Sequence, residues 1–382
     1  MPADGLVEHV VILVQENHTT DNYFRALAPY GGNVASDWPL SPNPPAHDQP
    51  HDRHAYFEWL TGKTGGAHAQ FDTQTALPYY LYLALSGAFL ENHCSGFGTN
   101  STANHLLIIG GQSPTLKNPS RLGPQPVWDL PSLPGHAEDH GVTWAFYAAA
   151  GNYPVAFYEQ LQGSPNVRPS ADFVTDVGGA TLPSLVFLYH DSPLDEHPPA
   201  DVTQGMNAVW EAVDAVVKQG FWESTVFMLT WDDWGGWDDH VATPLVEYTP
   251  DNVQLAYGPR VPLLLFGGHV KPGIDSRWCS HVSIPKTALQ LLRLPALGVP
   301  RVDDARGLAD LVDAAVGNLP PPGFGETLPI PPPPSPPLRA RRLPPRPRKA
   351  PVRVPRVLLR GGATLPAPND APLPRQRKPR TT

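Results

Sequence analysis

The stretch VVILV, residues 10–14, is a continuous run of apolar and mostly β-branched residues. Such a run is typical of a strand that is buried on both faces of a parallel sheet. Similar runs recur at residues 142–147, 184–189, 226–230 and 261–266. The sequence therefore predicts a mostly parallel central sheet.

Helical spacing of apolar residues appears in two other segments. It predicts one helix over residues 205–219 and a second over 284–292. The segments 28–75 and 112–140 are rich in Pro, Gly and His, and we expect loops there. Buried strands that alternate with helices predict an α/β fold with helices on both faces of the sheet.

The C-terminal segment, residues 318–382, has a composition unlike the rest of the chain. It contains 20 of the 49 prolines, and its 13 Lys and Arg against two acidic residues give a formal charge of +11, whereas residues 1–317 carry −20. Such a segment cannot bury a core. We predict one folded domain over 1–317 and a disordered, basic, Pro/Arg-rich tail over 318–382. The tail could bind an anionic partner, or be a solvated extension without one.

The sequence contains two cysteines, Cys94 and Cys279, too few for a disulfide framework, and whether they pair is left open. It has no run of about 18 apolar residues, so no transmembrane segment is predicted. The N-terminus lacks a basic stretch followed by an apolar one. We expect a cytoplasmic protein, or a secreted one if the true start lies upstream.

Acidic residues follow two of the predicted strands directly. Glu16 and Asn17 come after residues 10–14, and Asp232 and Asp233 come after 226–230. Ligands of open α/β sheets gather at the carboxyl ends of strands. Adjacent carboxylates repel each other, and a bound cation relieves that repulsion. The Asp pair alone would fit an acidic surface turn, but with Glu16 and Asn17 the pattern favours a metal site.

Ser101 lies just before the apolar run at residues 106–109. If that run is a helix, Ser101 is at its N-terminus, where free N–H groups and the helix dipole favour a phosphate. A metal-coordinated hydroxyl can act as a nucleophile. An ordinary N-cap serine is the more common role, and spacing alone favours it.

Eight of the fifteen histidines are candidates for acid–base chemistry, those at positions 47, 51, 54, 190, 197, 240, 269 and 281. His197, His240 and His281 rank highest because they flank predicted strand ends. Any single histidine is more often a surface or structural residue.

Several segments resemble, in order, the bacterial phosphoesterase family that contains phospholipases C and acid phosphatases of the A type. Residues 10–24, VVILVQENHTTDNYF, resemble its opening strand followed by QENRSFDxYF. Residues 101–104, STAN, fill its nucleophile motif of Ser or Thr, any residue, Pro and Asn. Residues 224–241, STVFMLTWDDWGGWDDHV, resemble TxDEHGGxxDHV. Further matches are at 196–199, 257–262, 281–284 and 301–305. Together they span about 7–310.

The resemblance implies an alkaline-phosphatase-like fold and hydrolysis of phosphate esters through a covalent phosphoserine. The substrate would be a phosphate monoester, or a diester such as a phospholipid. By position, one divalent or transition metal ion would be bound by Glu16, Asn17, Ser101, Asp232 and Asp233. Catalytic groups would be Ser101, His197, His240 and His281, and substrate contacts would be Thr102, Asn104 and Asp239. The family's early His-Asp element could be His47-Asp48 or His51-Asp52.

The chain departs from the family pattern at five positions. His18 and His105 each replace an Arg, and Ala103 replaces the Pro at the third position of the nucleophile motif. Asp233 replaces a Glu that many relatives have, and Trp234 replaces a His. The implied metal ligands are retained, so these departures bear on substrate choice. The alternative is a catalytically degenerate binding or scaffold protein that uses its basic tail.

Overall fold

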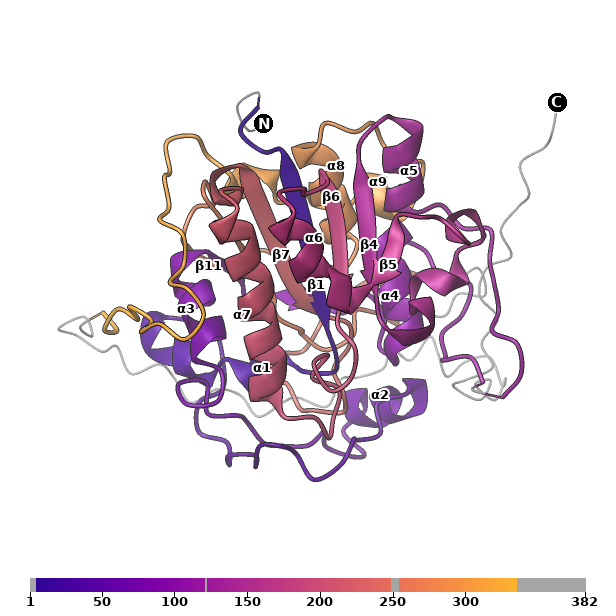
Figure 1. The fold of residues 1–382 in the computed structure, drawn as a ribbon. Helices are drawn as coiled ribbons and strands as arrows, with labels where there is room; N and C mark the ends of the chain where they lie inside the picture. The colour runs from indigo at the N-terminus through magenta and orange to yellow at the C-terminus, as the bar shows by residue number, and fades with distance from the viewer. Residues whose placement is uncertain (1–4, 121, 249–253, 335–382) are drawn as a thin grey trace.

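The computed structural model describes residues 5–120, 122–248 and 254–334. Their centre is an eight-stranded sheet with strand order β11-β2-β10-β7-β1-β6-β4-β5 (Figure 1). Its strands are β1 (His9–Gln15), β2 (Ala88–Leu90), β4 (Trp144–Ala148), β5 (Val167–Pro169), β6 (Leu185–Tyr189), β7 (Thr225–Trp231), β10 (Leu263–Gly267) and β11 (Gly273–Asp275). Two small sheets pair β3 (His93–Cys94) with β12 (Cys279–Ser280), and β8 (Leu245–Tyr248) with β9 (Gln254–Ala256).

The middle of the large sheet is parallel. β1 pairs in parallel with β6 and β7, and β4 pairs in parallel with β5 and β6. β10 runs antiparallel to β7 and β2. β1 therefore has parallel neighbours on both sides, and elements packed on both faces of the sheet bury all its residues.

Helices cover both faces of this sheet. They are α1 (Thr20–Tyr23), α2 (Arg53–Leu60), α3 (Pro78–Ser86), α4 (Ser101–Gly110), α5 (Leu133–Asp139), α6 (Phe173–Gly178), α7 (Val202–Lys218), α8 (Ser283–Leu291) and α9 (Pro300–Asp303). Short 3₁₀ helices are η1 (Arg25–Tyr30), η2 (Ala150–Asn152), η3 (Val155–Phe157), η4 (Glu159–Leu161), η5 (Ser170–Asp172), η6 (Trp222–Ser224) and η7 (Ala309–Leu311).

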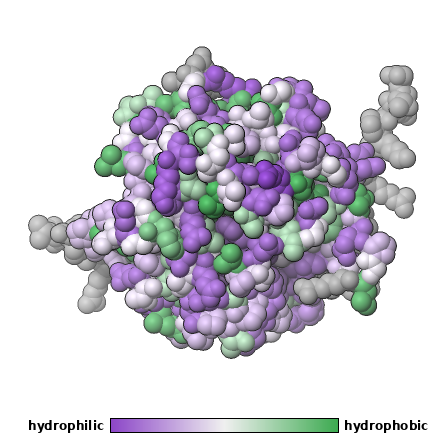
Figure 2. Space-filling model, in the orientation of Figure 1, coloured by the Kyte–Doolittle hydropathy of each residue, from purple (hydrophilic) through white to green (hydrophobic). Residues whose placement is uncertain are grey.

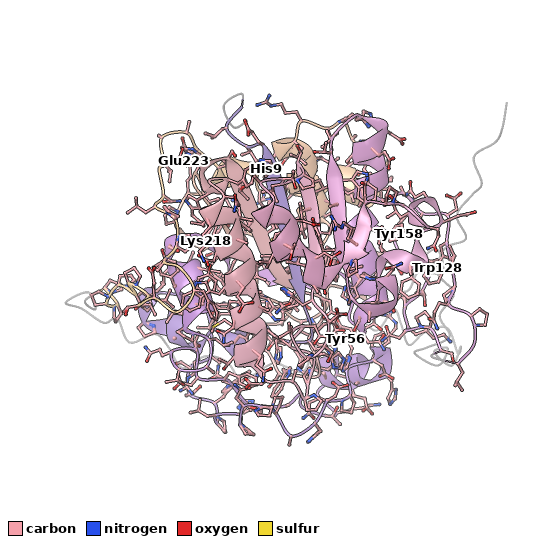
Figure 3. The ribbon with its side chains drawn as sticks, in the orientation of Figure 1. His9, Tyr56, Trp128, Tyr158, Lys218 and Glu223 are labelled. Atoms are coloured by element: carbon pink, nitrogen blue, oxygen red, sulfur yellow. The ribbon has the colours of Figure 1, made fainter. Side chains whose placement is uncertain are left out.

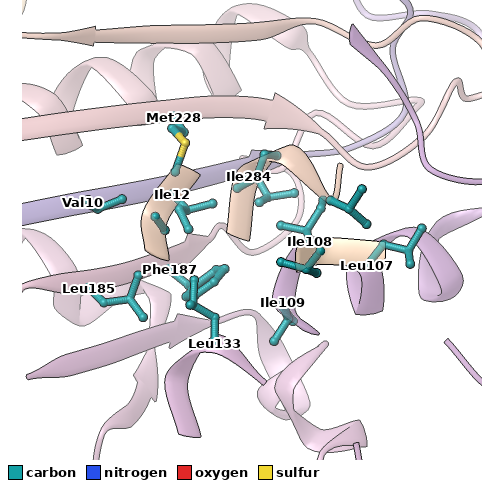
Figure 4. Packing of buried hydrophobic residues seen from close by; sticks show 14 of the residues in the cluster. Val10, Ile12, Leu107, Ile108, Ile109, Leu133, Leu185, Phe187, Met228 and Ile284 are labelled. Atoms are coloured by element: carbon teal, nitrogen blue, oxygen red, sulfur yellow. The ribbon is translucent and has the colours of Figure 1, made fainter. Parts of the chain in front are cut away.

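Alternate residues of β1 point to opposite faces and so divide the core in two. Val10, Ile12 and Val14 pack against α4, α5 and α8 (Figure 4). Val11 and Leu13 pack on the other face against α3, α6 and α7, and Figure 1 shows α6 and α7 in front of the sheet. The predicted fold class is confirmed.

The predicted strands correspond to β1, β4, β6, β7 and β10, and the predicted helices to α7 and α8. The expectation of loops over 28–75 and 112–140 is wrong at α2 and α5. These helices have eight and seven residues, too few for a periodic pattern. Side-chain caps begin both: Asp52 accepts from Ala55 N at 2.9 Å, and Ser132 Oγ accepts from Gly135 N at 3.1 Å.

Figure 3 shows toward which end of the molecule β1 and β7 run. Figure 3 labels His9, at the amino end of β1, and Glu223, just before β7, at one end of the molecule. Tyr56, in α2, lies at the opposite end. The carboxyl ends of β1 and β7 therefore point toward the end that holds α2.

The first part of the expected tail contacts the domain. Asn318 Nδ2 donates to Gly267 O at 3.1 Å and to Val270 O at 2.6 Å, and Trp222 Nε1 donates to Asn318 O at 3.0 Å. Trp210 Nε1 donates to Pro322 O at 3.1 Å. Residues 318–334 contain no helix or strand but pack on the domain, so the packed chain extends beyond residue 317. The remainder of the tail, residues 335–382, lies outside the described residues.

Cys94 and Cys279 are buried free thiols on the paired strands β3 and β12.

In the face shown in Figure 2, hydrophobic residues are interspersed among hydrophilic ones. Over the described ranges, the helices are all too short or too polar to span a bilayer.

Candidate active site

The carboxyl ends of β1 and β7 bring four predicted metal ligands together. The last residues of the two strands are paired in register. Glu16 and Asn17 therefore leave the sheet beside Asp232 and Asp233. Asn17 N donates to Asp232 Oδ1 at 3.0 Å and ties the two strand ends together. Asn17 has a φ of 68°, a left-handed conformation that Asn adopts more readily than most residues.

Helix α4 brings two side chains to the same place. Ser101 is its first residue, as predicted, and Ser101 Oγ donates to Asp233 Oδ2 at 3.2 Å. His105 lies one turn later, on the same face of the helix. His105 Nε2 lies 3.1 Å from Glu16 Oε1 and 3.4 Å from Asp232 Oδ2. The sequence pattern did not place His105 in the site, although its spacing of four from Ser101 is the signal that could have.

Glu16 and Asp232 face His105 in this buried space, and Asp233 lies next to them, against Ser101. Burial raises the pKa of Asp232 well above its ordinary value, and the charges of Asp233 and Glu16 raise it further. Burial also raises the pKa of Asp233. Burial alone would lower the pKa of His105, but the charges of Glu16 and Asp232 outweigh it, and the pKa is raised. Ionised carboxyl groups crowded away from water are costly, and positive charge placed among them reduces that cost.

The side-chain oxygens of Asn17, Glu16 and Asp232 fit a cation. The side-chain oxygen of Asn17 faces two more oxygens, Glu16 Oε2 at 3.3 Å and Asp232 Oδ1 at 3.2 Å, a repulsive arrangement unless a cation lies between them or the amide turns over. Oxygen donors with a nearby imidazole suit a hard divalent cation or a borderline transition metal.

The side-chain amide of Asn17 also faces two histidines. His197 Nε2 lies 3.2 Å away and His51 Nε2 lies 3.5 Å away. The Nδ1 atoms of these rings donate to main-chain oxygens, that of His197 to Pro198 O at 2.8 Å and that of His51 to Gln49 O at 2.6 Å. The structure thus brings His197 to the site as expected. Of the two His-Asp elements left open, His51 is the histidine that reaches Asn17.

A cavity of about 520 Å³ opens beside the strand ends. Its lining includes Glu16, Ser101, Thr102 and His197, and none of the described lining residues is Lys or Arg. Asp195 also lines it, and burial together with the charge of Glu16 raises the pKa of Asp195 to about 6. Asp195 precedes the recognisable EHPP segment, so no motif marked it in the sequence.

Two other predicted residues hold the main chain around the site. Asn104 Oδ1 accepts from Phe97 N at 2.9 Å and fixes the loop before α4. His281 Nδ1 accepts from Gly96 N at 3.1 Å, and its Nε2 donates to Trp231 O at 3.0 Å. Both ring nitrogens of His281 are therefore occupied by main-chain atoms, and burial lowers its pKa well below the ordinary value.

Asp239 and His240 belong to a buried ion cluster around Arg260, and neither lines the cavity. Arg260 Nε donates to Asp239 Oδ1 at 2.9 Å, and Arg260 Nη2 donates to Asp21 Oδ1 at 3.0 Å. His240 Nδ1 lies 2.5 Å from Asp21 Oδ2. These contacts connect α1 to the segment after β7, so they support the shape of the site from outside the cavity.

The model of the Phosphoesterase family matches residues 46–295, about two thirds of the chain. The chain belongs to the phosphoesterase family. The resemblance seen in the sequence motifs is therefore confirmed, and the family comprises hydrolases that act on phosphoric ester bonds.

Several known phosphoesterases are similar to this chain. Non-specific phospholipase C6 of Arabidopsis thaliana is 29% identical over an alignment of 256 positions that covers 57% of this chain and 48% of that protein. Phospholipase C A of Mycobacterium tuberculosis (strain ATCC 25618 / H37Rv) is 24% identical over an alignment of 313 positions that covers 62% of this chain and 60% of that protein. The chain thus spans less than two thirds of the length of these relatives.

Solved structures of similar fold include murine ectonucleotide pyrophosphatase/phosphodiesterase 5, with 10% identity and a TM-score of 0.46 over 80% of this chain and 100% of that one. Another is a protein of the alkaline phosphatase superfamily from Vibrio parahaemolyticus, with 15% identity and a TM-score of 0.43 over 79% of this chain and 70% of that one.

Proposed function

We propose that this phosphoesterase hydrolyses phosphate esters by attack of Ser101 on phosphorus. The supporting observation is that Ser101 Oγ, at the N-terminus of α4, donates to Asp233 Oδ2 at 3.2 Å and lines the same cavity as Glu16. A hydroxyl in this position can reach a bound phosphate ester while a carboxylate holds its proton.

One divalent or transition metal ion would be held by Glu16, Asn17, Asp232 and Asp233, with Ser101 beside them. Such an ion supplies positive charge that lowers the pKa of a coordinated hydroxyl and offsets the charge of a phosphate. That charge is needed because the described cavity lining contains no Lys or Arg.

The serine hydroxyl and His197 account for the proton transfers. Ser101 Oγ points its proton at Asp233 Oδ2 and so presents a lone pair for attack. Burial alone would lower the pKa of His197, but the charge of Glu16 outweighs it, and the pKa is raised. A protonated His197 can give its proton to the departing alkoxide. Attack forms the Ser101 O–P bond and breaks the ester P–O bond, and water then hydrolyses the phosphoserine.

The nucleophile is assigned to Ser101 rather than to Thr102. The family motif places the nucleophile two positions before the residue that is Ala103 here. Thr102 also lines the cavity, but it lies about 100° further round the helix than Ser101.

The substrate is either a phosphate monoester or a phospholipid diester. The curated relatives are named phospholipases C, which makes a phospholipid the first diester to examine. An anionic partner for the tail and a cytoplasmic location also stay predictions.

The experiment strips the purified full-length protein of metal with a chelator, confirms removal by elemental analysis, and restores single metals. Turnover is followed with p-nitrophenyl phosphate, bis(p-nitrophenyl) phosphate and phosphatidylcholine vesicles. We expect activity to require added metal, to be lost in Ser101→Ala, and to be mildly affected in the matched variant Thr102→Ala. Full activity in metal-free protein, or in Ser101→Ala, would show that the proposal is wrong.

A further inference from the structure

His105 contacts the two strand ends on the side that faces away from Asn17. One oxygen of each carboxylate faces His105 Nε2: Glu16 Oε1 lies 3.1 Å away and Asp232 Oδ2 lies 3.4 Å away. Their other oxygens, Glu16 Oε2 and Asp232 Oδ1, face the Asn17 side chain at 3.3 and 3.2 Å. One imidazole therefore reaches both carboxylates through the oxygens that do not face Asn17.

The ring of His105 is held in this orientation by its surroundings. It is fully buried and packs edge-on against Tyr153, with ring centroids 5.1 Å apart, and Tyr189, with centroids 5.3 Å apart. α4 fixes its backbone one turn after Ser101. A ring confined in this way can hold the direction of the carboxylates that it contacts.

From this geometry we propose that His105 is a positioning residue for the metal centre. It holds the outer oxygens of Glu16 and Asp232, so that their inner oxygens converge with Asn17 on the cation. The inference rests on the proposed metal centre and extends it by one residue.

Two other roles for His105 are less consistent with the structure. A phosphate contact requires access to the cavity, and His105 does not line it, whereas Ser101 does. A direct metal ligand normally donates its second ring N–H to an acceptor. His105 Nδ1 is buried and has no hydrogen-bond partner among the described residues.

Three variants test the proposal in the full-length chain. In His105→Gln, an amide N–H donor replaces Nε2 at a similar reach. His105→Leu fills a similar volume without a donor, and His105→Asn is polar but too short to reach the carboxylates. Binding of Mn²⁺ and Co²⁺ to metal-free protein is measured by calorimetry, with circular dichroism and thermal unfolding as controls of folding.

We expect His105→Leu and His105→Asn to bind metal about 10- to 100-fold more weakly than the wild type. His105→Gln should retain most of the affinity, and its Co²⁺ absorption spectrum should match that of the wild type because the ligands are unchanged. If Leu and Asn variants bind as tightly as the wild type, the proposal is wrong. A Co²⁺ spectrum that changes in His105→Gln would overturn it in favour of direct ligation. A wild-type protein that binds no metal would instead refute the proposed metal centre itself.

Discussion

Replacing Arg260 with Met should destabilise the fold through a network that lies outside the cavity. Arg260 is fully buried and donates to Asp239 Oδ1 at 2.9 Å, Asp239 Oδ2 at 3.1 Å and Asp21 Oδ1 at 3.0 Å. Its Nη1 also donates to Asn33 O and Glu91 O, both at 2.8 Å. Met has a similar length and no charge, so the variant Arg260→Met leaves these acceptors without their donor.

The size of the effect follows from burial. Asp21 and Asp239 are fully buried, and Arg260→Met removes the guanidinium that pairs with both. Removing one partner of a buried ion pair costs about 3–5 kcal/mol. At roughly 2–4 °C per kcal/mol for a large domain, the Tm should fall by roughly 6–20 °C.

The matched control is Arg277→Met. Arg277 pairs with Asp275 and Asp310 at the surface, where ion pairs contribute about 0–1 kcal/mol. Thermal and urea unfolding of both variants are followed by circular dichroism. An Arg260→Met protein as stable as the Arg277→Met control would refute the reasoning that this cluster is structural.

Other predictions concern pH and chain length. Burial raises the pKa of Glu196 from 4.5 to about 7. Its contribution to stability is therefore fully present below about pH 4.5 and is lost as the pH rises through 7. Urea unfolding of the wild type and of Glu196→Gln is compared from pH 4.5 to 8, and the free energy of unfolding of the wild type should fall by about 3 kcal/mol more than that of the variant. Parallel pH dependences of the two proteins would contradict this. Ending the chain after residue 334 should leave the Tm unchanged, whereas ending it after 317 removes Asn318 and uncovers Trp222, and should lower the Tm. Equal Tm values for the two truncations would show that residues 318–334 add nothing.

The parts of the fold that could be predicted are those with a strong local signal. Residues 10–14 are apolar without interruption because β1 is central in the sheet and is buried on both faces. The carboxyl ends of parallel strands lie at the same edge of a sheet, so the acidic residues that follow them lie close together. The proximity of Glu16 and Asp232 could therefore be predicted from the sequence. α2 was missed because its helix is too short for periodicity and is held by a cap at Asp52 and by tertiary burial.

The parts that could not be predicted depend on contacts between distant segments. Asp239 and His240 match family motifs. Their contacts with Arg260 and Asp21, which are distant in the sequence, could be found only in the structure. The role of Glu196 was hidden for the same reason. Its carboxylate accepts from Tyr23 OH at 2.8 Å and Trp231 Nε1 at 2.9 Å, from two different elements, and so anchors the segment that ends at His197.

The central claim is that Ser101 forms a covalent phosphoserine. The most direct measurement is rapid acid quenching of the metal-loaded protein during turnover, followed by peptide mass spectrometry of the α4 segment. The account predicts a phosphoryl group on Ser101 in the wild type and none anywhere on Ser101→Ala. A phosphoryl group on Thr102, or an unmodified protein throughout the first turnover, would contradict it.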